Sequence, residues 1–187
     1  MCIRDRVYIG HSTVIGKNCK IQSNSSIASD GFGYGQSQKG EHIFKPHLGC
    51  VIIEDDVDIG AGVCIDRGTY DDSKIGQGTK IDNMCHFGHN FVAGKYNLFT
   101  AGVMAAGSVT IGDYCVFGGG TLLTGHITIA SKVMVGGRSG VSKSIKEAGQ
   151  YAGYPLQKLK DNLRTMSSLQ HLPDMRKALR KLENNSP

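Results

Sequence analysis

The 187-residue sequence predicts a mainly β protein, a parallel β-helix built from hexapeptide repeats and followed by C-terminal α-helices. An apolar residue recurs at every sixth position from Ile75 to Val141, without exception. A period of six fits neither a helix, at about 3.6, nor a long strand, at two, and is typical of short strands joined by tight corners and stacked in coils. The 26 glycines and only four prolines agree with a backbone that turns often.

The repeat begins close to the start of the chain. Ile9, Ile15, Ile21 and Ile27 share one phase, and residues 53–65 keep the period in another. Solenoids normally carry a polar cap over the first coil, and none precedes Ile9. We therefore expect a β-helical domain over 7–143, with residues 1–6 the ragged start of a fragment whose upstream domain is missing.

Two insertions interrupt the phase of the repeat, residues 31–48 and four extra residues around Asp71. Insertions in a solenoid become loops on its outside and tend to mark the binding face. The first opens with a glycine-rich segment that carries Phe32 and Tyr34. These aromatic rings are either ligand-stacking groups for a flat or sugar-like molecule or surface residues of a turn.

The hexads stop after Val141, and a break at residues 151–155 separates them from a different pattern. Apolar residues three and four apart predict two amphipathic helices, about 156–170 and 173–184, within an extension over 155–184. From Lys158 onward the chain contains seven Lys or Arg residues and three Asp or Glu residues, and this excess of positive charge favours an acidic partner. Nucleic acid is not expected, because no aromatic residues interleave with the basic ones.

The six cysteines lie at least fourteen residues apart, so no zinc knuckle, redox pair or compact disulfide framework is spelled out. They are interpreted as reduced thiols. No secretory leader opens the chain, and no apolar run approaches the roughly 18 residues of a spanning helix. The sequence therefore predicts a cytoplasmic protein.

The stacking rule brings three groups into one column. With three hexads per coil, residues eighteen apart lie above one another, about 4.8 Å apart. His89 emerges near a corner, Gly107 lies directly above it, and Gly125 with His126 lies a further coil up. A neutral imidazole as base and a bare backbone N–H for an oxyanion suit acyl transfer. The simpler alternative is a solvated surface histidine.

Asp82 precedes His89 by one hexad plus one residue, so it belongs to the neighbouring side of the triangle. It orients His89 across an interface between chains, binds substrate, or caps a corner turn. His86 is expected at the surface or at an interface.

Six short segments stand in a characteristic order along the chain: Ser-Asp-Gly-Phe-Gly-Tyr at 29–34, Ile-Asp-Arg-Gly at 65–68, Ile-Asp-Asn at 81–83, Gly-His-Asn at 88–90, Gly-His at 125–126 and Pro-Leu-Gln at 155–157. With these segments the chain resembles, over about residues 7–184, the UDP-3-O-acylglucosamine N-acyltransferase family, which acts in the lipid A pathway of lipopolysaccharide synthesis. This resemblance implies a left-handed parallel β-helix, assembled as a homotrimer with active sites between chains. The family also has an N-terminal uridine-binding domain, which we expect to be missing from this chain.

The resemblance also implies roles for single residues. His89 matches the base that deprotonates the glucosamine 2-amine for attack on a 3-hydroxyacyl thioester of acyl carrier protein, and Gly107 matches the oxyanion donor. His126 matches the second active-site histidine, and the basic tail matches the region that meets the carrier. No metal or cofactor is implied, and the acyl chain length cannot be read. The residues expected to bind substrate are Asp82, Asn83, Asn90, Phe32 and Tyr34.

Three alternatives stay open. The segment at 135–140 resembles the related UDP-N-acetylglucosamine O-acyltransferase, although Asp-Gly-Phe-Gly-Tyr favours the N-acyl enzyme. A zinc hydratase of the γ-carbonic-anhydrase type needs three histidines, and Ser131 stands where the third ligand is expected. The last alternative is a non-catalytic solenoid scaffold that assembles through its helices.

Overall fold

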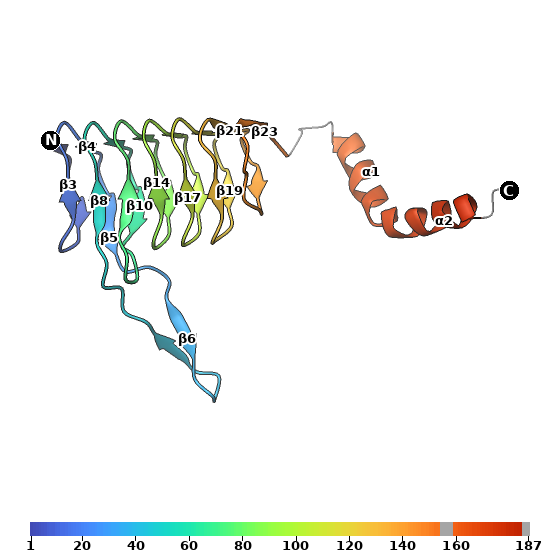
Figure 1. The fold of residues 1–187 in the computed structure, drawn as a ribbon, viewed down its shortest axis with the longest axis horizontal. Helices are drawn as coiled ribbons and strands as arrows, with labels where there is room; N and C mark the ends of the chain where they lie inside the picture. The colour runs from blue at the N-terminus through green and yellow to red at the C-terminus, as the bar shows by residue number, and fades with distance from the viewer. Residues whose placement is uncertain (154–158, 185–187) are drawn as a thin grey trace. The chain divides into compact units, whose positions relative to one another are not determined.

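The computed structural model describes residues 1–153 and 159–184. The chain divides into two compact units, Met1–Tyr154 and Pro155–Pro187. The first unit is a parallel β-helix, and the described part of the second is helical (Figure 1). The mainly β prediction with helices at the C-terminal side is confirmed.

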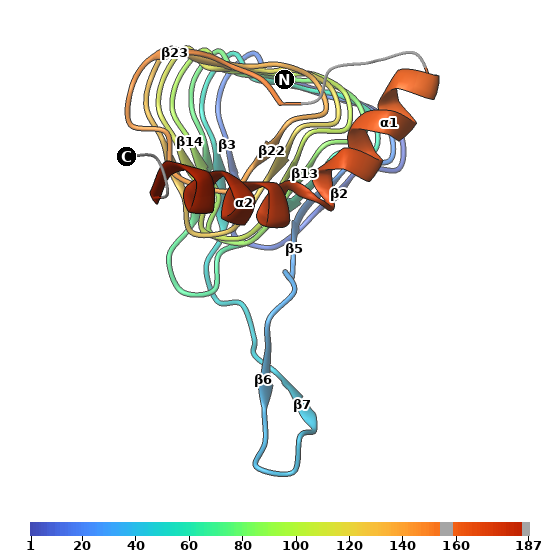
Figure 2. The ribbon, with the colours of Figure 1, turned by 90° about the vertical axis from the view of Figure 1, so that its right-hand side faces the viewer.

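Short parallel strands form the three walls of the β-helix, one strand per wall in each coil (Figure 2). The first wall contains, in spatial order, β1 (Cys2–Ile3), β4 (Lys20–Ile21), β9 (Asp58–Ile59), β12 (Lys80–Ile81), β15 (Leu98–Phe99), β18 (Val116–Phe117), β21 (Val133–Val135) and β23 (Gly149–Tyr151). The second contains β2 (Tyr8–Ile9), β5 (Ser26–Ser29), β10 (Cys64–Asp66), β13 (His86–Phe87), β16 (Met104–Ala105), β19 (Leu122–Leu123) and β22 (Gly140–Val141). The third contains β20 (Thr128–Ile129), β17 (Thr110–Ile111), β14 (Val92–Ala93), β11 (Ser73–Ile75), β8 (Val51–Ile53) and β3 (Val14–Ile15).

The register of these strands confirms the stacking rule. Phe87 pairs with Ala105, and Ala105 pairs with Leu123, so partners lie eighteen residues apart. The ladder also continues on both sides of 7–143, because β1 pairs with β4 and β23 pairs with β21. Strand pairing therefore covers residues that the apolar period alone does not reach.

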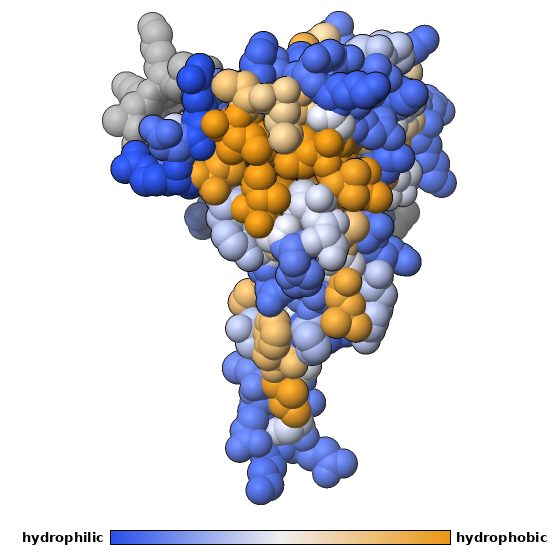
Figure 3. Space-filling model, turned by 90° about the vertical axis from the view of Figure 1, so that its left-hand side faces the viewer, coloured by the Kyte–Doolittle hydropathy of each residue, from blue (hydrophilic) through white to orange (hydrophobic). Residues whose placement is uncertain are grey.

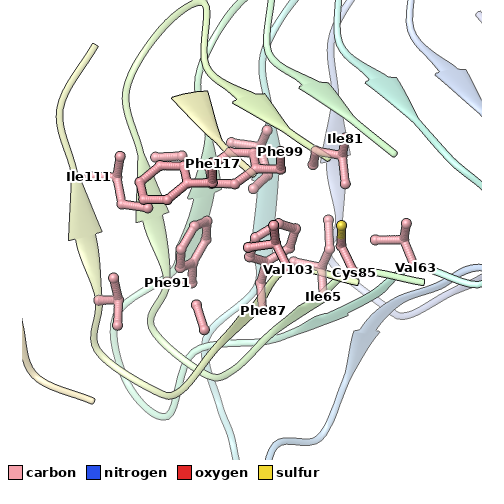
Figure 4. Close-up of a cluster of buried hydrophobic side chains, with 14 of the residues drawn as sticks. Val63, Ile65, Ile81, Cys85, Phe87, Phe91, Phe99, Val103, Ile111 and Phe117 are labelled. Atoms are coloured by element: carbon pink, nitrogen blue, oxygen red, sulfur yellow. The ribbon is translucent and has the colours of Figure 1, made fainter. Parts of the chain in front are cut away.

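The residues that recur every six positions fill the interior of the prism. Four phenylalanines pack there, each at most 1% exposed, and Phe87 stacks on Phe91 with ring centroids 4.4 Å apart (Figure 4). Phe99 stacks on Phe117 at 5.2 Å. Burying one such side chain stabilises the fold by about 1.5–3 kcal/mol. The cysteines predicted to face inward, Cys85 and Cys115, are buried as well.

The corners turn through residues with left-handed backbone conformation. At the corner that follows the second wall, Asn90, Ser108 and His126 have φ of 59°, 60° and 60°. Their spacing of eighteen places them in one vertical row. Asparagine tolerates this conformation better than most residues, whereas a branched or bulky side chain there is strained.

The two insertions leave the prism where the phase breaks. Residues within 31–48 form an antiparallel hairpin of β6 (Tyr34–Gln36) and β7 (His42–Phe44), which projects away from the coils (Figures 1 and 2). Because of the first insertion, Val14 pairs with Ile52, 38 residues later in the chain. Because of the second, Cys64 pairs with His86, 22 residues later instead of eighteen. Both insertions lie on the outside, as predicted.

The inward residues of the first coil are less covered than those of later coils. Val7, Ile9 and Ile15 are half-buried, whereas Ile27 and Ile65 are fully buried. An apolar patch is visible at this end of the prism (Figure 3). The hydrophobic interior is therefore open to solvent at its first coil in this chain.

The second unit contains α1 (Leu159–Leu169) and α2 (Leu172–Asn184). The predicted helices, 156–170 and 173–184, agree with these bounds, although residues 156–158 lie outside the described part of the chain. In α2, Leu172, Met175, Leu179 and Leu182 are all exposed. No helix among the described residues has the length and apolar character needed to cross a membrane.

Candidate active site

His89 lies at the corner where the second wall turns into the third. It follows β13, whose Phe87 points inward and is fully buried. Two residues later the chain has reached the outside, so the imidazole is half-buried rather than enclosed. The repeat thus fixes the height of His89, and the corner brings its ring to the surface.

Gly107 lies directly against the ring of His89. A Cβ atom at Gly107 would stand 2.5 Å from Nε2, 2.6 Å from Cε1 and 2.9 Å from Cδ2 of His89. Only a residue without a side chain therefore fits above this imidazole. Among the residues that the structure describes, no acceptor is paired with the Gly107 N–H, which leaves this donor available.

His126 meets the same column through its backbone. Its N–H donates to the carbonyl oxygen of Gly107 at 3.1 Å. Gly125, not His126, stands above Gly107, and His126 continues the row of Asn90 and Ser108 one residue further along the corner. The structure therefore brings His126 to the same edge, with its side chain exposed.

Asn90 fixes the tautomer of the neutral His89 imidazole. The Asn90 Oδ1 atom lies 2.9 Å from His89 Nδ1 and accepts the N–H of Thr69 at 3.0 Å, while Nδ2 donates to the carbonyl oxygen of Asp71 at 3.1 Å. The two backbone bonds settle which end of the amide is oxygen. Because that oxygen can only accept, Nδ1 carries the proton, and Nε2 keeps its lone pair as the basic atom.

A cavity of about 410 Å³ opens beside this column. Its wall contains His86 of β13, His89 of the following corner, and an apolar strip from β16 and β19. Asp66, at the end of β10, is the only carboxylate among the described residues that line it. The lining consists of Phe32, Asp66, His86, Gly88, His89, Met104, Ala105, Ala106, Gly107, Leu122 and Leu123.

A chain of rings connects the hairpin to the histidine column. Phe32 lies 5.2 Å from Tyr34, Tyr34 5.7 Å from Phe44, and Phe44 6.3 Å from His47, between ring centroids. His47 then lies 5.5 Å from His89. Phe32 also borders a second cavity, of about 520 Å³, with Tyr34, Gly35, Gln36 and His42. The predicted aromatic pair therefore reaches the site from outside the prism.

His47 lies beside His89, although no sequence pattern predicts it there. It is 4% exposed, and neither ring nitrogen has a hydrogen-bond partner in the described structure. It packs against Gly31 and Gly33, where side chains would collide with its ring. Burial lowers the pKa of His47, and His89 and Lys45 lower it further.

Asp66 and Arg67 belong to the Ile-Asp-Arg-Gly segment, and the sequence pattern predicts no role for either. Arg67 is 2% exposed and donates from Nε to Ala28 and from Nη2 to His11, both to carbonyl oxygens at 3.0 Å. Its guanidinium also lies 3.9 Å from Asp30. Arg67 thus ties the start of the first insertion to the coils below and above it.

Asp82 and Asn83 lie at a different corner, before β13 rather than after it. Asp82 accepts the N–H of Asn83 at 2.7 Å, and Asn83 Oδ1 accepts the N–H of Ala61 at 2.7 Å. Asp82 thus closes its own turn, Asn83 binds the backbone of the neighbouring coil, and both are absent from the cavity lining. Within one chain, the structure does not bring Asp82 and Asn83 to His89.

Ser131 has a structural bond of its own. Its hydroxyl oxygen accepts the N–H of Asp113 at 2.9 Å, one coil below. Within 1–153 and 159–184, no three His, Cys, Asp or Glu side chains are grouped to hold a metal ion.

Acid should destabilise the fold through His47. Its pKa is lowered on folding, so the neutral form is favoured in the folded state, and stability is lost as the pH falls below the ordinary value of about 6.5. The loss cannot exceed about 1.4 kcal/mol per pH unit for one proton. Chemical denaturation at pH 7.5 and 5.5 should show a smaller drop in His47→Gln than in the parent chain. His42→Gln, at an exposed position of the hairpin, is the control and should lose as much unfolding free energy between the two pH values as the parent chain. A different loss in His42→Gln, or a loss in His47→Gln equal to the parent's, would contradict the role given to His47.

The stacked hexapeptide coils and the imidazole under a bare glycine define a hexapeptide-repeat β-helix protein with a corner site. A curated UDP-3-O-acylglucosamine N-acyltransferase from Wolinella succinogenes is 43% identical over 159 residues, which are 85% of this chain and 50% of the relative. A second, from Anaeromyxobacter dehalogenans, is 42% identical over 185 residues, 96% of this chain and 51% of the relative. The chain belongs to the UDP-3-O-acylglucosamine N-acyltransferase family.

The chain spans about half the length of these curated relatives. Among solved structures, a crystal structure of UDP-N-acetylglucosamine acyltransferase has a TM-score of 0.72 at 24% identity, covering 81% of this chain and 56% of that one. The enzyme of the same name from Bacteroides fragilis has a TM-score of 0.69 at 22% identity, covering 81% and 57%. The fold is thus a left-handed parallel β-helix, as expected. No protein-family model matches the chain.

Proposed function

We propose that this chain carries the catalytic β-helix of an acyl-carrier-protein-dependent N-acyltransferase. The reaction moves a 3-hydroxyacyl group to the 2-amine of UDP-3-O-acylglucosamine, a step of lipid A biosynthesis. One observation carries the proposal: Asn90 holds the proton of His89 on Nδ1, so Nε2 is a free base beside an unpaired Gly107 N–H. The names of the relatives supply the substrate.

His89 and Gly107 divide the chemistry between them. The amine nitrogen attacks the thioester carbonyl carbon, and Nε2 takes a proton from that nitrogen, which is worth about 10²- to 10⁴-fold in rate. The carbonyl oxygen becomes an oxyanion that accepts a hydrogen bond from the Gly107 N–H. The C–S bond then breaks, the carrier thiolate takes the proton from Nε2, and the products are an amide and a free thiol. His126, at the same edge, serves as the second active-site histidine on the donor side.

The apolar strip of the cavity is suited to a hydrocarbon chain. Met104, Ala105, Leu122 and Leu123 line the wall that rises from His89 along β16 and β19. A fatty acyl group whose carbonyl lies at Gly107 extends along this strip and buries its methylene groups there. Each buried methylene contributes about 0.8 kcal/mol.

The nucleotide sugar approaches from the side of the hairpin. Phe32 is 86% exposed and borders both cavities, and Tyr34 lies next to it. Exposed rings of this kind stack on flat or sugar-like groups.

Asp82 and Asn83 support a homotrimer with shared sites. In one chain their corner is separate from the corner of His89, yet the family motif makes them substrate-binding residues. In a closed ring of three copies, the Asp82 corner of one copy faces the His89 corner of the next, and each site takes residues from two chains.

The basic tail is suited to an acidic carrier protein. In α2, Arg176, Lys177 and Arg180 surround a shallow cavity of about 290 Å³, and Lys181 follows. Clustered positive charge raises the rate of encounter with an acidic partner. The six free cysteines agree with reaction in the cytoplasm.

The proposal predicts which acceptor is used. With 3-hydroxyacyl carrier protein as donor, we expect amide formation on UDP-3-O-acylglucosamine and no ester formation on UDP-N-acetylglucosamine, measured by mass spectrometry of the products. An ester on the second acceptor would assign the O-acyltransferase reaction instead. The absence of transfer to either acceptor would leave the solenoid without this activity.

A further inference from the structure

Asp66 is a partly enclosed carboxylate in the wall of the His89 cavity. It ends β10, whose Cys64 and Ile65 pair with His86 and Phe87 of β13, so it lies on the level just before His89. Its side chain is 13% exposed, and its Oδ2 atom lies 3.9 Å from Nε2 of His86. Of the described residues lining this cavity, it alone carries negative charge.

Gly31 brings Asp66 and His89 together. A Cβ atom at Gly31 would stand 3.0 Å from Cβ of His89 and 3.2 Å from Oδ2 of Asp66. Both distances are measured from the same Cβ position, so Oδ2 of Asp66 and Cβ of His89 lie within roughly 6 Å of each other. The absence of a side chain at Gly31 permits this approach.

The proposed reaction leaves a positive charge that Asn90 cannot balance. Once Nε2 has taken the amine proton, His89 is an imidazolium, and its hydrogen-bond partner among the described residues is the neutral amide oxygen of Asn90. A carboxylate within a few ångströms in a partly enclosed site stabilises such a cation. Asp66 is the negative charge near this ring, with Oδ2 within roughly 6 Å of Cβ of His89.

We propose that Asp66 is a positioning residue of the transferase, whose carboxylate stabilises the imidazolium formed on His89. This inference rests on the proposed function. It assigns to Asp66 an electrostatic task that acts through His89.

The other charges around Asp66 are compatible with this task. Burial raises the pKa of Asp66, His86 and His89 oppose that rise, and Asp30 adds to it. Arg67, the next residue, donates its guanidinium N–H groups to the carbonyl oxygens of Ala28 and His11 and does not line the cavity. The imidazole of His47, held neutral by burial, adds no competing cation beside His89.

The test removes the charge and keeps the shape. In Asp66→Asn we expect kcat for amide formation to fall about tenfold or more, and the acid limb of the pH–rate profile to move to lower pH by about one unit. The direction follows because loss of a nearby anion makes it harder to protonate the imidazole. The His89 imidazole signal, assigned by its loss in His89→Gln and followed by NMR without substrate, should titrate at correspondingly lower pH. Asp66→Glu should restore part of both effects.

Asp58→Asn is the matched control. Asp58 lies on the outside of the first wall, beside Lys20 and Lys80, and its replacement should change neither profile. A fall in kcat for Asp66→Asn with unchanged pH profile and unchanged NMR titration would make Asp66 merely structural and overturn the inference. A shifted NMR titration in a chain that transfers no acyl group would support the coupling and sink the proposed function.

Discussion

Replacing His89 by alanine should lower kcat for amide formation by about 10²- to 10⁴-fold, with KM little changed. The reason is that Nε2 of His89 is the lone-pair base that the structure leaves free at the cavity, with its tautomer fixed through Asn90. Without it the amine must lose its proton to water while attacking. Steady-state kinetics with carrier-borne donor measures the effect.

The control for this variant is His171→Ala. His171 lies between α1 and α2, in the other unit of the chain, and its loss should leave kcat within twofold or so of the parent value. Size-exclusion chromatography and thermal unfolding should show that both variants keep the assembly and the fold. Normal turnover in His89→Ala would remove His89 from the chemistry.

Adding one methyl group at Gly107 should be nearly as damaging. The Cβ of Gly107→Ala would meet three ring atoms of His89 at 2.5–2.9 Å, closer than real Cβ contacts occur. The ring must move, because the backbone is held by the bond from the Ser108 N–H to the His89 carbonyl at 2.8 Å. A displaced imidazole and a crowded oxyanion donor together predict a fall in kcat of at least about 10²-fold.

Gly125→Ala tests whether this effect belongs to the position or to glycine in general. Gly125 lies one coil above Gly107, and a Cβ there would be 3.0 Å from the Gly107 carbonyl oxygen and 3.7 Å from Cβ of Ala106, with no contact to His89. We expect less than tenfold loss of kcat and similar thermal stability in both variants. Equal activities of Gly107→Ala and Gly125→Ala would refute the steric argument.

The sequence predicted the column around His89 because the column depends only on the repeat. Residues eighteen apart stack wherever parallel strands stay in register, so Gly107 had to lie over His89 once three hexads made a coil. The inward cysteines and the outward insertions follow from the same period. Local spacing sufficed because each coil contacts only its neighbours.

The remaining residues of the site could not be placed in this way. His47 lies in the segment that follows β7, the return strand of the hairpin, and Asp66 approaches His89 because Gly31 has no side chain. The path of an insertion is set by its own turns and by side-chain packing, which no six-residue period encodes. Asp82 and Asn83 lie at another corner, as the period predicts for Asp82, and the role proposed for them requires a partner copy.

The four extra residues near Asp71 show what irregularity contributes to a repetitive protein. Thr69 and Asp71 offer the backbone groups that hold the Asn90 amide, and through it the His89 tautomer. A designer who idealised this chain toward a perfect consensus would delete that stretch and gain a more uniform solenoid. His89 would then adopt either tautomer, and the regularised protein would have the fold of the enzyme without its activity.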